Sequence, residues 1–138
     1  MNELIYGIDQ IESAAKLLIS KAGNKKIWLF KGEIGAGKTT LIKKIAELLG
    51  SQDDFSSPTF GLIHPYSISN SNQLIYHIDF YRINHELELN QLGLEEIFNS
   101  GDFVFVEWPE IASGYIPDNH FDIEIVYLDE LIRKVIFL

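Results

Sequence analysis

Short apolar runs alternate with polar turns and with segments of helical periodicity along this chain of 138 residues. Apolar side chains recur at helical spacing over residues 8–21 and 38–49, which predicts two amphipathic helices. Residues 27–30 and 103–106 are wholly apolar, as is typical of strands buried on both faces of a sheet. One or two further short helices are expected within residues 86–98. The pattern therefore predicts an α/β protein.

Two pairs of strand-like segments predict antiparallel hairpins. Residues 61–68 and 74–80 flank a polar turn, and residues 122–128 and 132–138 flank another. A hairpin that directly follows the second helix departs from strict alternation of strands and helices, so the sheet should be mixed. With no linker or repeat in the sequence, we expect one domain spanning residues 1–138.

Composition narrows the class of protein. The net charge of −9 arises from 20 acidic and 11 basic residues, so the surface should repel the phosphate backbone of a nucleic acid. The absence of cysteine excludes disulfides and thiolate metal sites. No apolar run approaches membrane-spanning length, and residues 1–4 lack the basic start of a signal peptide. A cytoplasmic protein without membrane contact is expected.

The stretch GEIGAGKT at residues 32–39 matches the phosphate-binding loop G-x-x-x-x-G-K-[ST]. Its flanking strand and helix disfavour the alternative, a glycine-rich turn that binds nothing. Glycines let backbone N–H groups approach phosphates, Lys38 supplies a cation, and the hydroxyl of Thr39 can hold Mg²⁺. We therefore expect a P-loop nucleoside-triphosphatase-like three-layer sandwich that binds ATP with Mg²⁺. The candidate phosphate-binding residues are Glu33, Gly35, Ala36, Gly37, Lys38, Thr39 and Thr40.

Two apolar strands end in an acid, Asp79 after one and Glu107 after the other. Ligands of open α/β sheets gather at the carboxyl ends of the strands, where both acids should lie. A triphosphatase needs one carboxylate near the metal ion and a group that orients the nucleophile, so both are candidate catalytic residues. The alternative for each is a solvated residue at a strand boundary. The sequence leaves open which of them contacts the metal.

Other motifs carry less specific chemistry. The SPTF stretch at residues 57–60 is either a proline turn or a switch that senses the γ-phosphate. His77 alternates with buried positions, which favours a structural role over a catalytic one. Arg82 is either a charge stabiliser or an ion-pair partner, and Trp108 is either a core residue or a contact of the nucleotide.

Taken together, four motifs resemble the TsaE family. They are GEIGAGKTT at 32–40, SPTF at 57–60, HIDFYR at 77–82 and VEWP at 106–109, and they span most of the chain. The resemblance implies a small P-loop ATPase that helps to make N6-threonylcarbamoyladenosine at position 37 of tRNAs. It implies work in a complex with the TsaD and TsaB proteins, through which tRNA would be contacted only indirectly.

The resemblance also implies a role for each motif. Lys38 and the loop amides would bind the phosphates of ATP. Thr39 and Glu107 would hold Mg²⁺, while Asp79 would support the metal or the water that is used in hydrolysis. Contacts to the nucleotide base could come from Ile8, Asp9 or Arg133. Trp108 would lie near the nucleotide, and the nucleotide-sensing segment would consist of Ser57, Pro58, Thr59 and Phe60.

Two alternative functions stay open. The same loop serves small-molecule kinases, but these usually carry a mobile basic lid, and Arg82, Arg133 and Lys134 are the only basic residues after Lys44. A nucleotide-dependent binding switch with negligible turnover is the other alternative. The chain has no N-K-x-D motif for selecting guanine, so ATP should be preferred over GTP.

Overall fold

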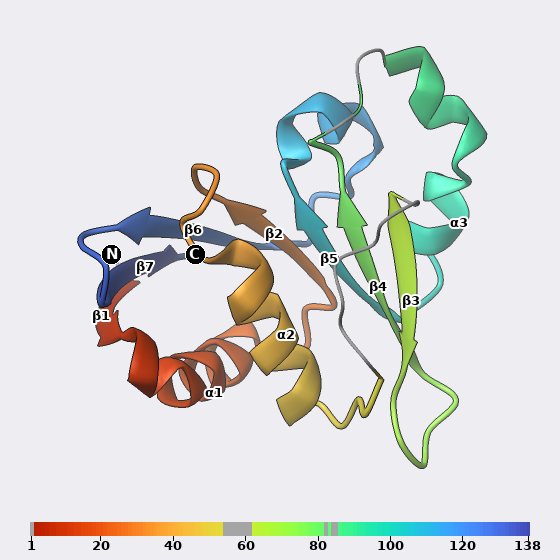
Figure 1. Ribbon diagram of the computed structural model, residues 1–138. Helices are drawn as coiled ribbons and strands as arrows, with labels where there is room; N and C mark the ends of the chain where they lie inside the picture. Colours follow the sequence, from red (N-terminus) through yellow and green to blue (C-terminus); the bar gives the residue numbers. More distant parts are fainter. Residues whose placement is uncertain (1, 54–61, 82, 84–85) are drawn as a thin grey trace.

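The computed structural model describes residues 2–53, 62–81, 83 and 86–138 (Figure 1). In this part of the chain, seven strands form one sheet with the order β1-β7-β6-β2-β5-β4-β3. The strands are β1 (Asn2–Gly7), β2 (Ile27–Lys31), β3 (Ile63–Ser67), β4 (Leu74–Asp79), β5 (Phe103–Glu107), β6 (Phe121–Tyr127) and β7 (Ile132–Phe137).

The sheet is mixed, as the hairpins predict. The four central strands β6, β2, β5 and β4 run parallel to one another. Antiparallel pairs flank them, with β3 on β4 at one edge and β7 on β6 at the other. β1 adds a further antiparallel edge strand beside β7. The sequence pattern does not predict β1, because only Tyr6 in it is buried.

Helices cover both faces of the sheet, which confirms the three-layer arrangement. The predicted helix over residues 8–21 begins as a 3₁₀ turn, η1 (Ile8–Gln10), and continues as α1 (Ile11–Ala22), which lies beside α2 (Lys38–Leu48) on one face (Figure 1). The other face carries η2 (Glu86–Gln91), α3 (Leu94–Phe98) and η3 (Pro109–Tyr115). Among the described residues, no helix is long and apolar enough to cross a membrane.

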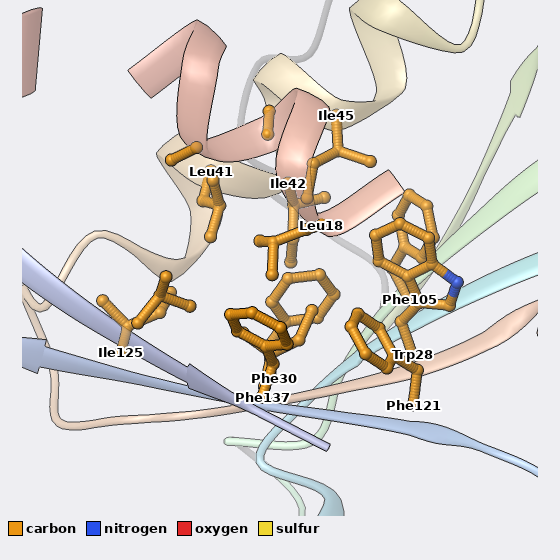
Figure 2. Packing of buried hydrophobic residues seen from close by; sticks show 14 of the residues in the cluster. Leu18, Trp28, Phe30, Leu41, Ile42, Ile45, Phe105, Phe121, Ile125 and Phe137 are labelled. Carbon is orange, nitrogen blue, oxygen red and sulfur yellow. The ribbon is translucent and has the colours of Figure 1, made fainter. Parts of the chain in front are cut away.

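A separate hydrophobic core lies on each face, and β2 contributes to both. Trp28 and Phe30 pack with Phe105 under α1 and α2, and all three side chains are almost fully buried (Figure 2). Ile27 and Leu29 point to the opposite core, beneath η3 and α3. Because apolar side chains leave both faces of β2, this strand is packed on both sides, and the loop that follows it starts from a well-anchored position.

Candidate active site

The phosphate-binding loop joins the end of β2 to the start of α2. Gly32 has a φ of 150°, and a Cβ there would lie 2.7 Å from the carbonyl oxygen of Ile125 on β6. Gly37 caps α2 with a φ of 105°, in the left-handed region that favours glycine. Between them, the N–H of Ala36 donates to the Glu33 carbonyl at 3.0 Å. The backbone is thus bent into a cradle at the positive end of a helix.

Lys38 is buried in this cradle, with 5% of its surface exposed. Its ammonium donates to the carbonyl of Gly32 and to that of Glu33, the latter at 3.4 Å. It also lies 4.0 Å from the ring centroid of Trp108, a cation–π contact. Burial lowers the pKa of Lys38, while the nearby carboxylates of Glu107 and Asp79 oppose this shift. The ammonium is therefore held in the cradle by two backbone carbonyls and by the indole of Trp108.

Thr39, in the first turn of α2, lies against the acid at the end of β5. Its Oγ1 is 3.2 Å from each carboxylate oxygen of Glu107, whose side chain is buried. Hydroxyl and carboxylate oxygens suit Mg²⁺, which typically keeps one or two protein carboxylates and completes its shell with phosphates and water. No group of three or more His, Asp or Glu in the described residues could hold an ion alone. The pair fits a metal that nucleotide phosphates help to bind.

Asp79 lies beside Glu107, because the two residues are register partners at the ends of β4 and β5. The parallel strands bring both acids to one edge of the sheet, as the sequence predicts. The backbone N–H of Tyr81 donates to Asp79 Oδ1 at 2.9 Å. Burial raises the pKa of Asp79; the Tyr81 hydrogen bond opposes this shift and the charge of Glu107 adds to it.

A cleft of about 370 Å³ unites most of the candidate residues. It is lined by Ile34, Gly35, Gly37, Lys38, Thr39, Thr40, Asp79, Tyr81, Glu107, Trp108 and Arg133. Glu33 and Ala36 line a neighbouring cavity behind the loop, against the end of β6. Ile8 and Asp9 do not line the cleft. The SPTF stretch at residues 57–60 and Arg82 lie outside the described residues, so their predicted roles stay predictions.

Two aromatic side chains shape the mouth of the cleft. Trp108 has a φ of 56°, in the left-handed region, and this turn after β5 brings its indole over Lys38. The indole also packs on the core beneath η3, in agreement with the core alternative, and its contact with a nucleotide stays a prediction. Tyr81 is half-exposed, and its ring lies 5.1 Å from that of Trp108. Tyr81 was not predicted from the sequence as a residue of the cleft, although its position two residues after Asp79 could have indicated it.

A family model described as "Threonylcarbamoyl adenosine biosynthesis protein TsaE" matches residues 6–135. The chain belongs to the TsaE family. The resemblance carried by the four sequence motifs is thereby confirmed.

Members of the TsaE family resemble the chain over most of its length. The "tRNA threonylcarbamoyladenosine biosynthesis protein TsaE" of Haemophilus influenzae is 33% identical over 117 residues, which are 84% of this chain and 73% of that protein. The protein of the same name from Bacillus subtilis is 34% identical over 130 residues, 94% of this chain and 79% of that protein. The crystal structure of YdiB from B. subtilis superposes with a TM-score of 0.73 at 27% identity, covering 99% of this chain and 84% of that one. The α/β fold is thus shared with a solved structure.

Arg133 on β7 holds the phosphate-binding loop from the side. Its Nε donates to the carbonyl of Ala36 at 3.0 Å, and Nη1 donates to that of Ile132 at 3.2 Å. Charge-assisted bonds to backbone are worth about 1.5–3 kcal/mol. Arg133→Met should therefore weaken ADP binding by roughly tenfold, because a freed Ala36 peptide no longer fixes the loop amides. Calorimetric titration with ADP measures this loss.

Lys134→Met is the matched control for Arg133→Met. Lys134 is the neighbouring cation on the same strand, but it is not among the residues that line the cleft. Its ADP affinity should stay within about twofold of wild type. Equal affinities in Arg133→Met and wild type would contradict a loop-holding role.

Proposed function

We propose that the chain is the Mg²⁺-dependent, ATP-binding and ATP-hydrolysing subunit for threonylcarbamoylation of adenosine 37 in tRNA, working in the cytoplasm with TsaD and TsaB. The names of its relatives support a role in the biosynthesis of threonylcarbamoyladenosine in tRNA. The observation that carries the ATPase assignment is the convergence of Lys38, Thr39, Asp79 and Glu107 on one cleft at the N-terminus of α2.

Phosphate binding follows from the loop. The amides of residues 35–39 and the positive end of α2 would receive the β-phosphate. Lys38 would exchange the Gly32 and Glu33 carbonyls for phosphate oxygens, a stronger partner for an ammonium. Because Trp108 covers the lysine from the other side, the exchange takes place out of bulk water, where electrostatic attraction is stronger.

Hydrolysis requires a held metal and an oriented water. Thr39 and Glu107 would hold Mg²⁺, which neutralises charge on the β- and γ-phosphates when it is bound. Asp79 would accept a proton from the attacking water, whose oxygen bonds to the γ-phosphorus as the bond to the β-phosphate oxygen breaks. The proton would then pass to the released phosphate. The backbone N–H of Tyr81 fixes the Asp79 carboxylate in place for this task.

Dependence on partners follows from charge. Neutralising several tRNA phosphates requires clustered Lys and Arg, while this chain carries a net charge of −9. The chain alone should therefore bind tRNA weakly and hydrolyse ATP slowly. A TsaD–TsaB complex should raise the rate of ATP hydrolysis by about tenfold or more, a factor of the size that coupling between two sites typically produces. Phosphate release with and without the complex, and tRNA binding by the isolated chain, measure both expectations.

A Lys38→Ala variant added to the same TsaD–TsaB complex separates turnover at this site from turnover by the partners. A rate that does not respond to the partners, or tight and salt-sensitive tRNA binding by the chain alone, would overturn the proposal. ATP binding without hydrolysis, in the chain and in the complex, would instead favour the nucleotide-dependent switch.

A further inference from the structure

The most deeply buried polar contact at the site does not involve the nucleotide cradle. His77 Nε2 lies 2.6 Å from Glu107 Oε2, and each side chain is only 4% exposed. His77 pairs in register with Phe105, so it is the diagonal neighbour of Glu107 on adjacent strands β4 and β5. Diagonal positions on one face of a sheet lie within reach of long side chains. Both residues face α2, on which Thr39 stands.

The direction of the hydrogen bond follows from its chemistry. An ionised carboxylate is an acceptor only, so Nε2 of His77 is the donor of this short contact whenever the Glu107 carboxylate is ionised. The bond occupies one of about four lone-pair sites on the carboxylate. Thr39 Oγ1, 3.2 Å from both oxygens, carries a single hydrogen and can donate to only one of them at a time. The carboxylate therefore keeps lone pairs for a further partner, and Glu107 is one of the residues that line the cleft.

This contact selects one orientation of the buried Glu107 carboxylate. Glutamate has three side-chain torsions, and the hydroxyl of Thr39 is equidistant from the two oxygens, so it does not select one orientation. His77, in contrast, is bonded to one named oxygen from a central strand. A buried carboxylate that lost this donor would also seek other partners, since an unpaired buried charge is costly.

We propose that His77 is a positioning residue of the metal site, which fixes the Glu107 carboxylate so that it and Thr39 present oxygens to Mg²⁺. The inference rests on the proposed role of Glu107 as a metal ligand and adds a partner behind it. Replacing partners of this kind typically lowers metal affinity by about 10- to 100-fold. It differs from a packing role, which any side chain of similar volume would fill.

Four variants at two histidines test the proposal. His77→Leu keeps an apolar volume but removes the donor. His77→Gln places an amide N–H at nearly the distance of Nε2, while His77→Asn carries the same amide one methylene short. His120→Leu is the matched control, because His120 also pairs with a carboxylate, that of Asp122 at 3.3 Å, but outside the cleft.

Two calorimetric measurements separate metal from nucleotide. ADP affinity in the presence of a chelator reports the phosphate cradle, and titration of Mg²⁺ into the ADP complex reports the metal site. In His77→Leu and His77→Asn the Mg²⁺ concentration at half-saturation should rise by at least about tenfold. It should stay within about threefold of wild type in His77→Gln and in His120→Leu. The affinity for ADP in the presence of a chelator should be unchanged in all four variants.

The outcomes are distinguishable from failure of the proposed function. The metal assignment and this inference fail together in either of two cases. In the first, Mg²⁺ has no effect on ADP binding by the wild-type protein; in the second, Glu107→Ala keeps the effect that the wild type shows. If the wild type and Glu107→Ala behave as expected and the His77→Leu and His77→Asn titrations equal wild type, the inference alone is wrong. Equal losses in His77→Gln and His77→Leu would likewise overturn it. Should His77→Leu not fold, the His77→Asn and His77→Gln pair decides.

Discussion

Lys38→Ala should abolish ATP hydrolysis and weaken ATP binding by about 100-fold, or roughly 2.7 kcal/mol. The ammonium is the only side-chain cation of the phosphate-binding loop, at residues 32–39. Its charge-assisted bonds to phosphate oxygens, each worth about 1.5–3 kcal/mol, are lost outright in the variant. Among the described residues that line the cleft, the other cation is Arg133, which is bonded to backbone carbonyls and should therefore not substitute for Lys38.

Lys44→Ala is the matched control for Lys38, because it removes a lysine from the same helix. The Lys44 ammonium lies 2.9 Å from Glu47 on the surface of α2, away from the cleft. Exposed ion pairs of this kind contribute little, so ATP binding should stay within about twofold of wild type. Calorimetry with ATP and Mg²⁺ gives the affinities, and phosphate release gives the rates. Unchanged binding and turnover in Lys38→Ala would remove the basis of the ATPase proposal.

Much of the site could be predicted because its chemistry is local in sequence. The loop at residues 32–39 carries its strand, glycines and helix within one stretch. Asp79 and Glu107 are far apart along the chain, but both follow apolar strands, and parallel pairing then places them side by side. The convergence of loop and acids therefore depends on strand ends alone, which hydrophobic patterns reveal.

The contacts that could not be predicted depend on backbone turns and pairings with no local signal. The left-handed conformation of Trp108, whose ring lies over Lys38, is rare for a large side chain and has no signal in the local sequence. The bond from His77 to Glu107 requires the register of two strands, and alternation alone favours a structural histidine. β1 is likewise stabilised by β7 more than by its own apolar pattern.

Asp79→Asn should lose hydrolysis by two orders of magnitude or more while ATP binding is largely retained. The amide keeps an oxygen that accepts the Tyr81 N–H, so the local turn should persist. The asparagine cannot, however, accept a proton from the attacking water. General-base catalysis of this kind contributes about 10²–10⁴-fold in rate.

Glu107→Gln is the isosteric counterpart of this variant at the neighbouring acid. It should lose Mg²⁺-dependent nucleotide binding together with hydrolysis.

Asp79→Asn should also make the nucleotide-free protein more stable at neutral pH. Burial raises the pKa of Asp79 in the folded state above its value in the unfolded chain. At a pH below the ordinary aspartate pKa of about 4, the group is protonated in both states and costs nothing. As the pH rises through the folded-state pKa, the unfolded chain ionises more readily, so stability is lost. A neutral asparagine avoids this loss.

The melting temperature of Asp79→Asn should therefore exceed that of wild type at pH 7, and the difference should shrink toward zero as the pH is lowered past 4. Thermal unfolding across this pH range, without nucleotide or Mg²⁺, measures both curves. A gain in stability paired with a loss of hydrolysis identifies a carboxylate that is kept at an energetic cost for its chemistry. A variant that is less stable at pH 7 would show instead that Asp79 serves the fold, and one that hydrolyses ATP at the wild-type rate would show that Asp79 takes no part in hydrolysis.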